Sequence, residues 1–110
     1  METLGQQRRS EVVPAFDLRS LSMFVTVVEC GSFTRAAAAL KVTTACVSLT
    51  IKRLERALGA QLLRRDAHGL VLTHDGDRLL PAARRMLALN AELMREWPAA
   101  TGRSVTAVAA

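Results

Sequence analysis

Tyrosine is absent from this sequence of 110 residues, and its aromatic residues are three phenylalanines and one tryptophan. Half of the residues are nevertheless hydrophobic, so the core must be aliphatic and rich in Leu, Val and Ala. Strands are enriched in aromatic and β-branched residues, whereas Leu and Ala favour helices. The composition therefore favours packed helices over a β-sandwich, in one domain with a modest core.

Cysteine is also scarce, and the spacing of the two cysteines is uninformative. Cys30 and Cys46 form neither a CxxC pair nor the Cys/His spacing of a metal site. We expect two reduced thiols in a cytosolic chain, while a disulfide joining the end of one helix to the start of another stays open. His68 and His74 do not complete a ligand set, so we predict no metal and no cofactor.

Long apolar runs are missing too. No run approaches the roughly 20 apolar residues that a membrane span requires. The N-terminal sequence METLGQQRRSEVV lacks the apolar core of a signal peptide, which argues against export. These two absences predict a cytoplasmic protein without a membrane partner.

Groupings of residues typical of catalysis are absent as well. Ser48 has no histidine or acid near it in the sequence that would activate it as a nucleophile. Asp75 and Asp77 are explained by the start of a helix, where the macrodipole favours acidic residues. We therefore expect no enzymatic activity.

Positive charge is what the sequence does contain, and it is concentrated in one third of the chain. The formal net charge is +5, and between Thr34 and Arg65 seven cations accompany a single acid, Glu55. A localised basic field suits a polyanion, with nucleic acid first and an anionic membrane surface second. The seven cations are Arg35, Lys41, Lys52, Arg53, Arg56, Arg64 and Arg65.

Capping residues and apolar periodicity predict three helices before residue 60. Residues 1–14 form a polar leader, and Asp17 then caps a helix that Gly31 ends. Its predicted apolar set is Leu18, Leu21, Phe24, Val25 and Val28. Ser32 caps a short helix whose inward residues are Ala36, Ala37 and Leu40. After a turn at 41–42, Thr43 caps a third helix that reaches Leu58, with a buried stripe of Val47, Ile51, Leu54 and Leu58.

The remainder predicts a β-hairpin and a long helix. Two brief apolar runs flank the turn 66–69, and Thr73 then caps a helix over 74–97. Pro81 is expected to cause a bend or a weak first turn near residues 77–81 of this helix. Its two apolar stripes indicate a second surface to bury, which we interpret as a dimer seam whose register Asn90 helps to fix. Residues 98–110 form a flexible tail. The predicted dimerisation residues are Leu79, Leu80, Ala83, Met86, Leu87, Asn90, Leu93, Met94 and Trp97.

Three segments carry a resemblance to a known family: FDLRSLSMFVTVVECGSFTRAAAALKVT, VSLTIKRLERALGAQLLRR and LTHDGDRLLPAARRML. In this order and spacing, over residues 16–93, the chain resembles the N-terminal DNA-binding domain of LysR-type transcriptional regulators. The resemblance implies a mainly α fold, with a winged helix-turn-helix over 15–73 and a linker helix over 74–97 that pairs two copies. An effector-binding domain normally follows in this family. We expect the chain to be either a fragment of a longer regulator or a naturally short one, without that domain.

The predicted reading residues lie on the helix 43–58. A helix in the major groove needs short groups near base edges and cations at its margins for phosphates. Where the family usually has Ser-Gln-Pro-Ala-Leu-Ser-Arg-Gln-Ile, this chain has TTACVSLTI, so Leu49 cannot donate to guanine but can contact a thymine methyl. The predicted base-edge residues are Thr44, Ala45, Ser48, Leu49 and Lys52. The predicted phosphate or wing residues are Arg35, Lys41, Thr43, Arg53, Arg56, Arg64 and Arg65.

The predicted function is sequence-specific binding of double-stranded DNA by a homodimer that regulates transcription, in the bacterial cytoplasm and on the nucleoid when bound. Arg65 is expected to contact phosphate or the minor groove, whereas His68 is interpreted as a turn residue. The competing hypothesis is a winged-helix module for protein interaction. In that case the basic face meets an acidic protein, or the chain only forms heterodimers with full-length relatives.

Overall fold

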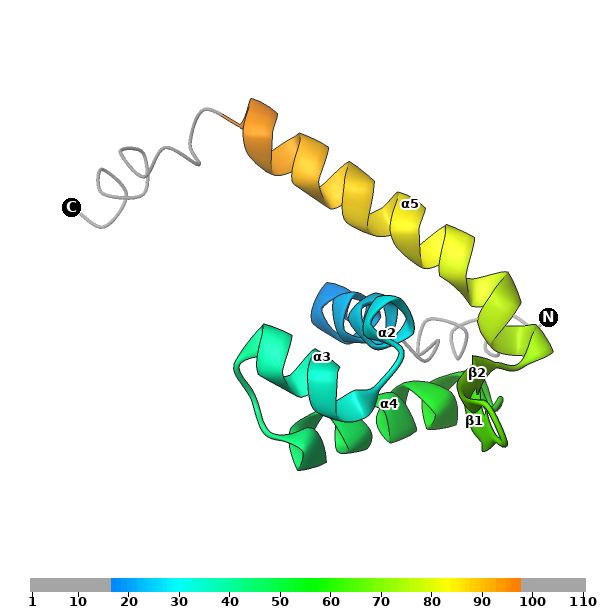
Figure 1. Ribbon diagram of the computed structural model, residues 1–110. Helices are drawn as coiled ribbons and strands as arrows, with labels where there is room; N and C mark the ends of the chain where they lie inside the picture. Colours follow the sequence, from blue (N-terminus) through cyan, green and yellow to red (C-terminus); the bar gives the residue numbers. More distant parts are fainter. Residues whose placement is uncertain (1–16, 98–110) are drawn as a thin grey trace, which may run out of the picture.

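The computed structural model describes residues 17–97, so the predicted leader and tail lie outside the described part. Within it, three helices precede a hairpin and a long final helix, which confirms the predicted fold class (Figure 1). The elements are α2 (Leu18–Cys30), α3 (Phe33–Leu40), α4 (Thr44–Leu58), β1 (Leu63–Asp66), β2 (Gly69–Leu72) and α5 (His74–Glu96).

Each helix begins at the polar side chain that the sequence predicted. Ser32, Thr43 and Thr73 each accept a backbone N–H bond from the residue three positions later, at 3.0–3.1 Å. Asp17 accepts bonds from both the N–H and the hydroxyl of Ser20, at 2.9 and 2.8 Å. These bonds favour the carboxylate and lower the pKa of Asp17, so this cap weakens as the pH falls through that pKa.

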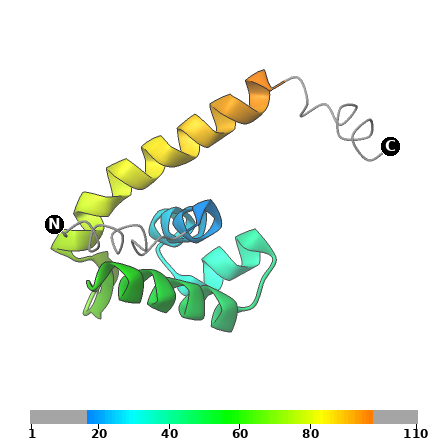
Figure 2. The same cartoon turned by 180° about the vertical axis from the view of Figure 1, so that it is seen from behind.

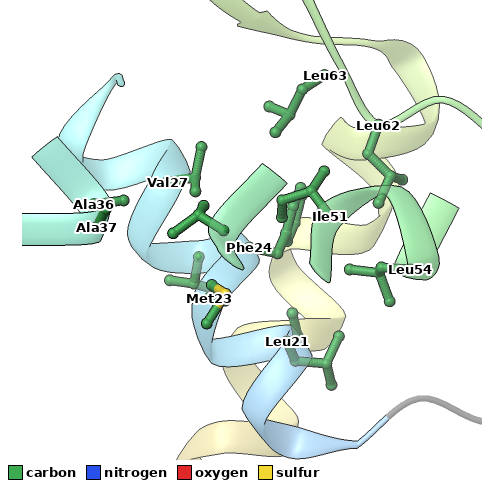
Figure 3. Close-up of a cluster of buried hydrophobic side chains, with 13 residues drawn as sticks. Leu21, Met23, Phe24, Val27, Ala36, Ala37, Ile51, Leu54, Leu62 and Leu63 are labelled. Atoms are coloured by element: carbon green, nitrogen blue, oxygen red, sulfur yellow. The ribbon is translucent and has the colours of Figure 1, made fainter. Parts of the chain in front are cut away.

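The core lies where α2 packs against the other three helices (Figure 3). Because α2 touches α3, α4 and α5, it buries more than one face, and Met23 and Val27 are buried although the apolar periodicity did not select them. One residue of the predicted apolar set is corrected: Leu18 in the first turn of α2 is 37% exposed, whereas Val28 is half-buried and packs against the core. The predicted inward residues of α3 are placed as expected, with Ala36 and Ala37 buried and Leu40 half-buried.

The stripe of α4 is confirmed at Val47, Ile51 and Leu54, each at most 2% exposed. Leu58 is the exception, because it is 40% exposed and the prediction that it is buried was wrong. It lies in the last turn of α4 and lines an open depression with Leu62 and Leu79, which leaves much of its side chain in solvent.

The hairpin, here called the wing (63–72), is a two-stranded antiparallel sheet with Leu63 opposite Leu72 and Asp66 opposite Gly69. Helix α5 starts at the base of the wing, crosses α2 and continues past the three-helix body (Figures 1 and 2). Pro81 lies inside α5 without interrupting it. No helix within residues 17–97 combines the length and apolar character that a bilayer span requires.

Candidate nucleic-acid interface

Helix α4 has one side in the core and an opposite side in solvent. Ala45, Leu49 and the three cations Lys52, Arg53 and Arg56 are all exposed. At about 100° per residue, these positions lie across the helix from the buried stripe. The outward side of α4 is therefore an accessible surface that is apolar in its first turns and cationic in its later ones.

A groove of about 600 Å³ runs along one edge of α4, between this helix, the start of α3 and the wing. It brings together three of the five predicted base-edge residues and two predicted wing cations, which lie far apart in the sequence. Ala45 and Leu49 do not line it and stand further out on α4. The predicted residues that line the groove are Thr44, Ser48, Lys52, Arg64 and Arg65.

Arg65 is held over the start of α3. Its guanidinium carbon lies 5.9 Å from the centroid of the Phe33 ring, within the range of a cation–π interaction. A contact with the ring does not use the N–H donors of the guanidinium, which stay available for a phosphate or a base edge. The structure therefore brings the wing cation that the sequence singled out beside the start of α3.

Glu55 joins α4 to the base of the wing, a role that sequence reasoning did not assign. Its Oε2 atom accepts the backbone N–H groups of Leu62 and Leu63, at 2.7 and 3.4 Å. Charge-assisted bonds of this kind are stronger than neutral ones. The sequence held one signal for this role, because Glu55 is the single acid of a basic segment. A carboxylate repels phosphates, so its position indicates a bonding partner within the protein and not in DNA.

Replacing Glu55 by alanine is expected to lower the free energy of unfolding by roughly 1–3 kcal/mol, because two part-buried N–H groups lose a charged acceptor. Glu55→Gln keeps an acceptor and should cost less. Urea denaturation measures both. The matched control is Glu29→Ala, which removes an exposed carboxylate that lies 3.6 Å from Arg84 and should cost below about 1 kcal/mol. Equal losses for Glu55→Ala and Glu29→Ala would refute the role of Glu55.

The other predicted phosphate residues lie around the ends of the helices. Arg35 is exposed on α3, Thr43 caps α4, and Lys41 ends α3 in the left-handed region with φ of 59°. Arg53 lines a depression of about 290 Å³ together with Arg19, from the start of α2. Sequence reasoning missed Arg19, because its proximity to α4 arises only in the folded chain.

The tip of the wing is a turn in which the N–H of His68 donates to the Asp66 carboxylate, at 2.7 Å. Its imidazole is not involved in that bond, and the residue is exposed. Among the described residues, no three His, Cys, Asp or Glu side chains gather as potential metal ligands.

The predicted dimerisation residues fall into two groups along α5. Leu79, Leu80 and Leu87 pack partly against the core, and Ala83 is fully buried within the chain itself. Ala83 therefore leaves no surface for a partner. Asn90 is half-buried, and four residues of the distal half of α5 and its end are exposed: Met86, Leu93, Met94 and Trp97. Leu89, which was not predicted, is exposed as well.

Three packed helices, a hairpin after the third and a groove lined by cations between them define a winged helix-turn-helix of the nucleic-acid-binding class. The family model described as bacterial regulatory helix-turn-helix protein, lysR family, matches residues 18–77. The chain belongs to this family, which confirms the resemblance seen in the sequence.

Individual relatives agree with the family model. The chain is 45% identical over 78 residues to the HTH-type transcriptional regulator CfxR of Cupriavidus necator, covering 71% of this chain and 25% of CfxR. It resembles the BenM DBD in its complex with catB site 1 DNA, with a TM-score of 0.70, 35% identity and coverage of 73% and 90%.

A second solved structure is full-length CbnR complexed with its target DNA, at a TM-score of 0.70 and 33% identity, covering 76% of this chain and 29% of CbnR. The chain spans about a quarter of the length of the curated relatives CfxR and BauR. The similarity thus concerns the helix-turn-helix part of these regulators.

Proposed function

We propose that this chain binds double-stranded DNA sequence-specifically and thereby regulates transcription, with α4 as its recognition helix in the major groove. The observation that best supports this proposal is the groove that is lined by Ser48 and Lys52 of α4 together with Arg65 of the wing. A helix that enters the major groove leaves its flanking hairpin beside the sugar-phosphate backbone. The similar BenM DBD and CbnR structures are complexes with DNA, which supports duplex DNA over a protein-interaction module.

The proposed roles follow from position on the interface. Thr44, Ala45, Ser48, Leu49 and Lys52 face base edges from the outward or groove side of α4. The cations at the margins contact phosphates: Arg35, Lys41, Arg53, Arg56, Arg64 and Arg65, with Thr43 at the start of α4. Phosphate contacts fix register and supply affinity, whereas base contacts specify sequence. We place this activity in the bacterial cytoplasm, on the nucleoid when bound, and without a catalytic step.

Selection of duplexes from a random pool tests the proposal and its division of roles. We expect enrichment of one sequence, and an altered preference for Ser48→Ala and Lys52→Ala, with a loss of roughly 1–3 kcal/mol at the position that each residue contacts. Arg53→Ala should instead weaken binding to the enriched and random duplexes by the same factor. If all three variants shift the sequence preference equally, the division of roles is refuted. If no sequence is enriched from the pool, sequence-specific binding itself is refuted.

The distal half of α5 supports a homodimer as part of the same proposal. Leu89, Leu93, Met94 and Trp97 expose apolar surface on a helix that extends beyond its own domain (Figure 1). Such surface is stable in water when a second copy covers it. Two recognition helices could then read successive major grooves about one helical turn apart or a multiple of it.

Leu93→Glu is expected to shift the chain toward monomer, raising the dimer dissociation constant at least about tenfold, because the carboxylate would be buried in the seam. Sedimentation equilibrium at micromolar concentrations measures this. Leu58→Glu introduces the same charge at an exposed leucine outside α5 and should leave the constant unchanged. A wild-type chain that sediments as a monomer at these concentrations would rule out the dimer.

A further inference from the structure

The first two turns of α4, residues 44–51, carry an unusual set of side chains for a surface that reads bases. Their sequence, TACVSLTI, contains no Arg, Lys, Asn, Gln, Asp or Glu. Those residues make the direct hydrogen bonds that identify guanine, adenine and cytosine in the major groove. The first two turns therefore lack the side chains for three of the four bases, apart from hydroxyls that bond to any of them.

Leu49 is the large side chain in this segment that reaches solvent. It is 46% exposed, whereas Val47 and Ile51 on either side are at most 2% exposed. Its position is almost opposite the buried stripe, at about 100° per residue, so it is the part of these turns that stands furthest from the core. A helix that enters the major groove through its N-terminal turns would thus meet the base edges with Leu49.

We propose that Leu49 is a specificity-determining residue of α4 and reads the 5-methyl group of a pyrimidine in the major groove. This inference rests on the proposed DNA-binding function and names the chemistry that it recognises. The major-groove edge of thymine carries a methyl group beside its O4 acceptor, and apolar side chains distinguish thymine by contact with it. The same methyl group is carried by 5-methylcytosine, so two bases can present the ligand.

The cations around Leu49 fit this role. Lys52 and Arg53 lie one turn further along α4, and both are exposed. They would hold the helix in the groove through contacts with phosphates or a base edge. The contact of Leu49 with the methyl group would remove apolar surface of both groups from water. Affinity would then come largely from the cations, and the apolar contact of Leu49 would add discrimination at one base position.

Uracil substitution tests the inference. The probes are the duplex enriched from the random pool and copies in which each thymine in turn is replaced by deoxyuridine, which removes only the methyl group. We expect one thymine in each half-site at which the wild-type chain loses affinity about fourfold. Leu49→Ala should bind the thymine and uracil duplexes equally, while Ser48→Ala, the matched control, keeps the difference. At that position, the affinities for duplexes with 5-methylcytosine and with cytosine are compared, which shows whether 5-methylcytosine also supplies the methyl group that Leu49 contacts.

The outcomes separate this inference from the proposed function. Absence of duplex binding, or of any enriched sequence, overturns both. An enriched sequence whose affinity is insensitive to every uracil substitution overturns the role of Leu49 alone, as does a Leu49→Ala chain that discriminates thymine from uracil like the wild type. Leu49→Ala replaces an exposed residue by a better helix former, so its thermal midpoint should match that of the wild type and exclude misfolding.

Discussion

Replacing Gly76 by alanine is expected to lower the free energy of unfolding by about 3 kcal/mol. A Cβ atom at this position of α5 would clash with the carbonyl oxygen of Leu62 and would lie 2.8 Å from a methyl group of Leu72. The first contact is with backbone, which yields only if the base of the wing moves. The loss should appear even though alanine favours a helix by about 1 kcal/mol over glycine.

Gly59→Ala is the matched control for this prediction. Gly59 ends α4 with φ of 67°, but nothing lies within 4 Å of the added Cβ. Its cost is therefore the backbone strain of the left-handed region, roughly 1–2 kcal/mol. Urea denaturation of both variants measures the difference. If Gly76→Ala were no less stable than Gly59→Ala, the close packing of α5 against the wing would be disproved.

Arg65→Ala is expected to weaken binding of every duplex about tenfold or more, irrespective of sequence. The wing lies at the edge of the groove, where its cation meets the sugar-phosphate backbone. Loss of one phosphate contact in each of the two subunits should also reduce the steepness of log Kobs against log salt by about 1.8, at about 0.9 per contact. Fluorescence anisotropy with the enriched and a scrambled duplex, at several salt concentrations, measures both quantities.

Two further variants test whether position as well as charge matters at Arg65. Arg95→Ala removes the same charge from the last turn of α5, far from the wing, and should leave the salt slope unchanged (Figure 1). Phe33→Leu keeps an apolar side chain but removes the ring beneath the guanidinium, so it should reproduce part of the loss. It should add little to Arg65→Ala, and a fully additive double variant would mean that the ring does not position the cation.

The parts of the fold that sequence predicts well are those that local chemistry decides. Asp17, Ser32, Thr43 and Thr73 cap helices through bonds to residues three positions away, so their roles are readable without knowledge of the fold. The hairpin is similar, because a short turn pairs strands adjacent in sequence. Family resemblance added the arrangement of these elements around α4.

The features that sequence did not predict depend on contacts between elements. Met23 and Val27 are buried because α2 lies between other helices, a fact that one-face periodicity cannot express. Glu55 on α4 and Gly76 on α5 both lie against the backbone of Leu62, at the base of the wing. Their structural roles therefore depend on how these two helices pack beside the wing. The candidate site shows the same limit. Its residues on α4 were selected from helical geometry, but the cation–π contact of Arg65 requires the packing of the wing beside α3.

A salt titration of binding shows whether the basic outward side of α4 and the wing bind duplex DNA. The measurement is the anisotropy of a labelled duplex, with the sequence enriched from the random pool, from low to physiological ionic strength. We expect binding at low salt and a linear fall of log Kobs with log salt, with a slope of about −0.9 for each phosphate contacted. Absence of duplex binding at low ionic strength, or binding that salt does not weaken, would contradict this expectation.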